Sequence, residues 1–138
     1  MSTPLVDVIR LGPATKIRLT TLKRRTGVEN WNVLCRWAFC LSLNDGDPVG
    51  ERHDEVGVSI EMTWKTFAGD SPDLYEALLV CRVAEEASEL HTTTVITLLR
   101  RHITRGVSRL VGTPDLDSIV GLVSPQLGDM CLAKGPHN

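Results

Sequence analysis

The sequence predicts a small, mainly α-helical protein with short β-strands that works as an oligomer. A short apolar, β-branched run ends at a Gly-Pro pair, and two helical segments follow it. The second of these segments is apolar on nearly every side, and positive and negative charges are segregated along the chain. A length of 138 residues suits a single domain, which we expect to span residues 1–138.

The N-terminal segment is expected to form a strand over residues 5–11, because it is rich in Leu, Val and Ile. Pro13 then suits the first turn of a helix, where the amide that proline lacks would have no partner. This helix should run from about Ala14 to Arg25, with Gly27 as its C-terminal cap.

Asn30 is a suitable N-cap for a second helix over residues 31–43, completing a strand-helix-helix unit over 5–43. Apolar side chains occupy both sides of this helix. One side holds Trp31, Leu34, Cys35, Ala38 and Leu41, and the other holds Val33, Trp37, Cys40 and Leu43. A helix without a polar face must be covered from both sides, and a partner subunit is the simplest cover.

Residues 44–55 form an acidic loop, and strict alternation then predicts a half-buried strand over residues 56–65. Ser71 and Pro72 start a third helix, expected over residues 71–90. Its buried stripe is predicted to contain Leu74, Leu78, Cys81 and Ala84 or Glu85.

A fourth helix is expected over residues 92–111. Its apolar face contains Val95, Leu98, Leu99, Ile103, Gly106 and Leu110, with His102 as a core histidine, and Arg101, Arg105 and Arg109 form a stripe beside it. Residues 115–123 could add a short helix within the tail, 112–138, which carries no recognisable motif.

The formal net charge of −2 conceals a strong segregation. Residues 1–43 hold seven Lys or Arg against two acids, residues 44–90 hold twelve acids against three bases, and residues 91–112 hold four arginines and no acid. Such blocks suggest a polarised surface, with one basic face able to meet a polyanion.

Several classes of protein are disfavoured. The longest apolar runs are too short for a membrane span and no secretory signal is evident, so we expect a cytoplasmic protein. The spacing of the four cysteines predicts buried thiols, and neither they nor the histidines form a metal-ligand pattern, so no metal or cofactor is expected. Catalytic motifs are also missing; Glu61, His102 and Asp73 could serve a nicking enzyme, but nothing in the sequence groups them.

The strand-helix-helix order matches the ribbon-helix-helix plan, in which two chains pair their strands and the ribbon enters the major groove of DNA. Here the strand is apolar apart from Asp7 and Arg10, so it offers few groups that read base edges. The basic side chains lie instead on the first helix, which favours contact with the phosphate backbone.

Several stretches resemble the family of the DNA sulfur modification protein DndE. They are Lys16-Ile17-Arg18-Leu19, Leu22 to Gly27, Asn32 to Arg36, Cys40 to Leu43, Gly69 to Leu79 and His102 to Gly106. The resemblance implies a ribbon-helix-helix-like fold, a tetramer, binding of nicked double-stranded DNA, and other Dnd proteins as partners. It also implies that lysines dominate the DNA contact, for which the matching candidates are Lys16, Arg18, Lys23, Arg24 and Arg25.

The leading hypothesis is therefore a non-catalytic DNA-binding subunit of the phosphorothioate modification machinery. One alternative is a scaffold, in which the acidic segment 44–90 docks other Dnd proteins. Another is a ribbon-helix-helix repressor, against which the apolar strand argues.

Overall fold

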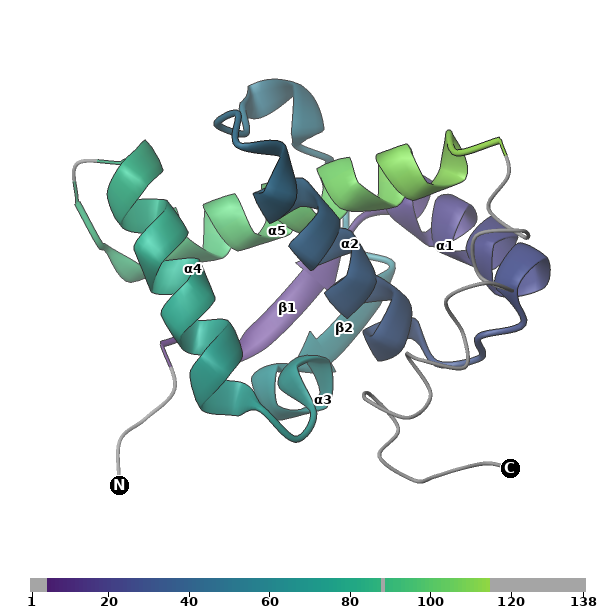
Figure 1. Cartoon of the computed structure of the whole chain (residues 1–138), viewed down its shortest axis with the longest axis horizontal. Coiled ribbons are helices and arrows are strands. Elements are labelled where there is room, and N and C mark those ends of the chain that lie inside the picture. The colour runs from purple at the N-terminus through teal and green to yellow at the C-terminus, as the bar shows by residue number, and fades with distance from the viewer. Residues whose placement is uncertain (1–4, 88, 115–138) are drawn as a thin grey trace.

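The computed structural model describes residues 5–87 and 89–114, which form a mainly helical fold with a two-stranded antiparallel sheet (Figure 1). The tail beyond residue 114, with the helix considered at 115–123, lies outside the described residues. In chain order the elements are β1 (Val8–Leu11), α1 (Pro13–Thr26), α2 (Trp31–Asp45), the 3-10 turn η1 (Glu51–His53), β2 (Ile60–Thr63), α3 (Trp64–Ala68), α4 (Pro72–Glu86) and α5 (Thr92–Val111).

Helix α1 begins and ends where the local sequence signals place it. Pro13 occupies its first turn, and Gly27 closes it in the left-handed conformation with φ of 77°. The Gly27 amide donates to the Lys23 carbonyl at 2.9 Å. Helix α5 covers the same residues as the expected fourth helix, and α2 extends two residues beyond its expected end.

The sheet pairs β1 with β2 of the same chain, from Val8 opposite Thr63 to Leu11 opposite Ile60. Both strands of this ribbon therefore belong to one chain: Arg10 of β1 and Glu61 of β2, 51 positions apart in sequence, form an ion pair at 2.8 Å. In the ribbon-helix-helix plan, the second strand would come from a second copy of the chain. One edge of β1 is already occupied by β2.

The strand expected over residues 56–65 is restricted to 60–63. The last bond of the ladder joins the Ser59 amide to the Leu11 carbonyl at 2.8 Å, because β1 ends there and Pro13 starts α1. Val56, with no strand to pair with, is 96% exposed. At the other end the Thr63 side chain accepts the Thr66 amide and starts α3, so the chain turns helical at Trp64.

Helix α5 is the centre of the fold, and α2 crosses in front of it in Figure 1. The crossing is close because Gly106 of α5 lies against the backbone of Ala38 of α2: a Cβ at position 106 would be 2.7 Å from the Ala38 Cα and nearer still to its carbonyl. Phe39 of α2 and Phe67 of α3 extend this core with an edge-to-face ring pair, 5.8 Å apart.

The core supplies most of the cover that α2 was expected to gain from a partner. Leu34, Cys35, Ala38 and Phe39 are buried within this one chain, while Trp37 is half-buried and Cys40 is exposed. The apolar composition of α2 therefore gives weaker support for an oligomer than it did in the sequence alone.

Helix α4 (72–86) is shorter than expected, and the face that it packs against the core is not the one predicted from the sequence. Leu74 is 57% and Leu78 37% exposed, whereas Leu79 and Val83 are buried. The reason is that polar side chains of α4 have partners on the core side. The Glu76 carboxylate accepts the Leu5 amide at 3.0 Å, Arg82 donates to the Leu43 carbonyl, and Glu86 accepts the Val49 amide at 2.9 Å.

Candidate nucleic-acid interface

The basic side chains of α1 divide into two groups on opposite sides of the helix. Thr15, Leu19 and Leu22 are buried and fix the helix against the core. Lys16 and Arg24 are exposed on the outer side, and α1 contains no acidic residue to neutralise them.

Lys23 lies next to the outer group, with its ammonium 4.2 Å from the centre of the Trp31 ring. Arg25 turns the other way and donates to the carbonyls of Val111 at 3.0 Å and Thr113 at 2.8 Å. Arg25 thus satisfies the last carbonyl of α5 and one just beyond the helix, and its main contacts are structural. Of the five basic residues proposed from the sequence, the structure groups Lys16, Lys23 and Arg24.

The arginine stripe of α5 is largely neutralised within the protein. Arg101 forms a bidentate pair with Asp54 at 2.7 and 2.8 Å, and Arg109 pairs with Asp45. The Arg101 hydrogen bond lowers the pKa of the Asp54 carboxyl, and the same bond raises the pKa of Arg101. The charge blocks that are separate in the sequence therefore meet in the fold, and the predicted basic face does not extend along α5.

The N-terminus of α1 holds a carboxylate that the sequence did not reveal. Glu55 accepts the backbone amides of Ala14 at 2.9 Å and Thr15 at 3.2 Å, and also the Thr15 hydroxyl. Gly12 makes room for it, since a Cβ at position 12 would lie 2.7 Å from the Glu55 Cβ. This helix end is therefore closed to a phosphate group.

A hollow of about 480 Å³ lies between α1, η1 and α5. Its lining includes Arg18, Arg52, His53, Arg105 and Arg109 together with hydroxyl-bearing Thr104 and Ser108. Sequence reasoning did not find this hollow. Its basic residues come from three separate elements, and the arginines of η1 and α1 are 34 positions apart in the chain.

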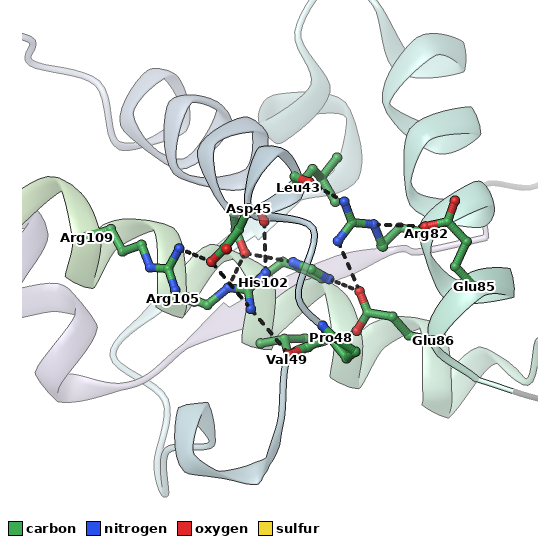
Figure 2. A network of polar contacts seen from close by, with 11 residues as sticks. Leu43, Asp45, Pro48, Val49, Arg82, Glu85, Glu86, His102, Arg105 and Arg109 are labelled. Carbon is green, nitrogen blue, oxygen red and sulfur yellow. Dashed lines mark hydrogen bonds and ion pairs between the residues drawn. The ribbon is translucent and has the colours of Figure 1, made fainter.

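A second polar cluster is buried beneath this hollow. The Ser42 hydroxyl lies 2.7 Å from His102 Nδ1, and His102 Nε2 lies 2.8 Å from a Glu86 oxygen. Arg105 donates from Nε to the Ser42 hydroxyl and from Nη2 to the Ser42 carbonyl, each at 2.8 Å. Figure 2 shows Arg82 and Glu86 reaching the cluster from one side and Arg109 from the other.

This serine, histidine and glutamate form a satisfied structural network. Burial lowers the pKa of His102, so at neutral pH the ring is neutral, accepts the Ser42 proton at Nδ1 and donates from Nε2 to Glu86. Ser42 and His102 are fully buried. Glu61 of β2 is ion-paired with Arg10 of β1, and Asp73 lies in the first turn of α4, so each has different surroundings from His102.

The cysteines differ from the expectation of buried thiols. Cys35 is buried, which raises its pKa to about 12, but Cys40 and Cys81 are exposed; Cys131 lies outside the described residues. Within residues 5–87 and 89–114, no three His, Cys, Asp or Glu side chains are grouped to hold a metal ion. Nor does any helix of these ranges have the length and apolar character to cross a membrane.

Comparison with known proteins finds a family model and similar solved structures. The model of a family described as the DNA sulphur modification protein DndE matches residues 8–118. The chain is also similar in fold to the crystal structure of DndE from Escherichia coli B7A, described as involved in DNA phosphorothioation modification. The two share 21% sequence identity with a TM-score of 0.60, over 75% of this chain and 96% of that chain. No curated protein sequence matches the chain.

Proposed function

Because the chain belongs to the DndE family of DNA sulphur modification proteins, we propose that it is the non-catalytic DNA-binding subunit of the phosphorothioate modification machinery. It binds double-stranded DNA, nicked DNA included, through the phosphate backbone and with little dependence on base sequence.

The observation that carries this proposal is the outer side of α1. Lys16 and Arg24 are exposed there on a helix without acids, and Lys23 lies beside them over Trp31. Arg18 faces the hollow and Arg25 holds the end of α5, so they contribute less to this contact. Cations that project from a rigid helix without side-chain base readers suit phosphate contact.

The sheet supports backbone contact over base reading. Arg10 is the basic side chain of β1, and it is ion-paired with Glu61 across the ladder. Ile9 and Leu11 point into the core. A sequence-specific repressor would need polar side chains projecting from this ribbon, and a ribbon between two copies would have to use the edge of β1 away from β2.

The proposal is tested with the double variant Lys16→Ala/Arg24→Ala and a nicked duplex of fixed length. Losing two phosphate contacts should reduce the slope of log affinity against log salt by about 1.8 in magnitude, for every duplex sequence alike. Lys65→Ala is the matched control, because Lys65 is an exposed lysine on α3. Fluorescence anisotropy at salt concentrations from 50 to 200 mM measures the affinity and its dependence on salt. An unchanged slope in the double variant would refute the α1 site.

A second candidate is a scaffold that contacts other Dnd proteins, and α4 favours it. Leu74, Leu78 and Cys81 form an exposed stripe with small apolar neighbours on the outer face of this helix. Such a stripe is a candidate protein-contact surface, either with those partners or between copies in the proposed tetramer. Two experiments on Leu74→Glu/Leu78→Glu separate the two cases. A smaller assembly in light scattering indicates that the stripe joins copies of the chain. Loss of co-purification with other Dnd proteins in the absence of DNA indicates a scaffold.

A further inference from the structure

The hollow between α1, η1 and α5 has the composition of an anion site. Four arginines and a histidine line it, from three elements, against two carboxylates. Its volume of about 480 Å³ is in the range of ligand pockets, and it is larger than a single phosphate group requires. Among the residues that the structure describes, no Trp, Tyr or Phe lines it, so they offer no aromatic platform on which a base could stack.

Both lining carboxylates are already engaged by groups of the protein. Asp54 holds Arg101 in a bidentate pair, and Glu55 accepts the amides at the start of α1. Arg18 and Arg52 have no ion pair with a carboxylate among the described residues. Two of the four lining arginines, Arg18 and Arg52, thus keep a positive charge that no carboxylate within residues 5–87 and 89–114 pairs with.

Arg105 supplies a fixed charge at the floor of the hollow. The residue is 2% exposed, and Ser42 holds its guanidinium through two bonds of 2.8 Å. Its nearest ion-pair partner is Asp45 at 3.9 Å, which pairs more closely with Arg109. Arg105 Nη1 also donates to the Pro48 carbonyl at 3.3 Å, and the carboxylates of Glu86 and Asp47 act on its charge. Arg105 therefore contributes a fixed, internally bonded cation at the floor of the hollow.

The positive charges around the hollow affect the pKa of His53. Its pKa is lowered first by burial and then by Arg52, Arg105 and Arg101, while Asp54 acts weakly in the opposite direction. The imidazole is therefore neutral when the hollow is empty. An anion with two charges would reverse the effect of the arginines and favour the protonated ring.

The walls of the hollow are held in place before any ligand arrives. The Asp54–Arg101 pair fixes the residue after η1 to α5, and Arg100 donates to the carbonyls of Glu55 at 3.2 Å and Gly57 at 2.9 Å. Glu55 joins the same segment to α1. The segment that carries Arg52 and His53 is thus fixed against α1 and α5, and such preorganisation of the backbone favours affinity.

We propose that this hollow binds a phosphate monoester, specifically the terminal phosphate of a DNA strand with its sugar, through Arg18 and Arg52, with Arg105 as a fixed charge at its floor. The proposal rests on the proposed function, since it adds a site for a strand end beside the backbone contact of α1. A terminal phosphate carries close to two negative charges at neutral pH and three acceptor oxygens, unlike the single charge of a phosphodiester. A concave site with several cations distinguishes the two better than an exposed helix face does.

The test uses the full chain and two duplexes with one nick, which differ only in having a 5′-phosphate or a 5′-hydroxyl at the nick. We expect the 5′-phosphorylated duplex to bind about tenfold tighter, the effect of a charged hydrogen bond of about 1.5 kcal/mol. Arg18→Ala/Arg52→Ala should abolish this preference. Lys16→Ala/Arg24→Ala should weaken binding of both duplexes equally and preserve the ratio, and Lys65→Ala should change neither.

A second readout follows the His53 ring protons by NMR as pH is varied. The 5′-phosphorylated strand should raise the pKa of His53, the 5′-hydroxyl strand should not, and inorganic phosphate alone should raise it only at high concentration. If phosphate matches the strand at equal concentration, the site is one for free phosphate and the proposal fails. Equal affinity of the parent for both duplexes also overturns it. Failure of both duplexes to bind would instead reject the proposed function.

Discussion

Gly106→Ala adds one methyl group at the point where α5 crosses α2. The added Cβ would lie 2.7 Å from the Ala38 Cα and closer to the Ala38 carbonyl, well inside van der Waals contact. The obstacle is helix backbone, which cannot rotate aside as a side chain can. The two central helices would have to separate by about 1 Å, and a gap of that size loses a quarter to half of the dispersion energy across the contact.

The magnitude follows from two opposing effects. Overpacking by one methylene costs about 1–3 kcal/mol and more where the neighbour is rigid, to which the loss of packing around Ile103 and Phe39 adds. The gain in helix propensity from Gly to Ala is only about 1 kcal/mol. With the cost at the upper end of that range, we expect a net loss of about 2 kcal/mol in the free energy of unfolding. For a slope of about 2 kcal/mol per M, this corresponds to about 1 M in the urea midpoint.

Urea denaturation followed by circular dichroism measures this difference. Gly112→Ala is the matched control, because Gly112 follows the same helix with φ of −77° and a Cβ there would lie an ordinary 3.5 Å from the Ser108 carbonyl. That variant should stay within about 0.5 kcal/mol of the parent. If Gly106→Ala is as stable as Gly112→Ala, the close crossing described above is wrong.

Three further predictions concern His102, the cysteines and Arg25. Burial lowers the pKa of His102, so below about pH 6.5 the unfolded chain binds a proton that the native chain does not. The free energy of unfolding should therefore be at its full value above that pH and fall by up to about 1.4 kcal/mol per pH unit below it. Between pH 7.5 and pH 5.5, urea titrations should show a larger loss in the free energy of unfolding for the parent than for His102→Gln. At pH 8 a thiol reagent should modify Cys40 and Cys81 but spare Cys35, whose pKa is about 12, as mass spectrometry would show; modification of Cys35 in the native protein would contradict its burial. Arg25→Met should cost about 1–2 kcal/mol of stability by releasing the carbonyls at the end of α5, whereas a residue that served DNA alone would cost nothing.

Features that depend on neighbours in sequence could be predicted. Pro13 and Gly27 delimit α1, and the hydrophobic period of residues 92–111 coincides with α5, because capping and helical period act within a few residues. The exposed positions of Lys16 and Arg24 also follow from that period, since the buried side of α1 is set by its apolar residues.

Features that depend on residues distant in sequence could not be predicted. The face of α4 was assigned from Leu74 and Leu78, but Glu76 and Glu86 direct the opposite face inward through bonds to amides 71 and 37 positions away. The same limit hid the hollow, whose cations come together only when η1 is fixed against α5. Charge segregation in the sequence suggested an open basic stripe, whereas pairing across the fold removed much of it.

The pairing of β1 with β2 sets the order in which the protein can fold. Arg10 and Glu61 are 51 positions apart, so the ladder closes a long loop before it gains any hydrogen bond. Helices α1 and α2 lie within that loop and can form locally in well under a millisecond. The sheet is therefore expected to assemble late, onto helices already in contact. Lengthening the turn after Gly46 should change the folding rate little, because doubling a loop adds only about 0.6 kcal/mol to its closure.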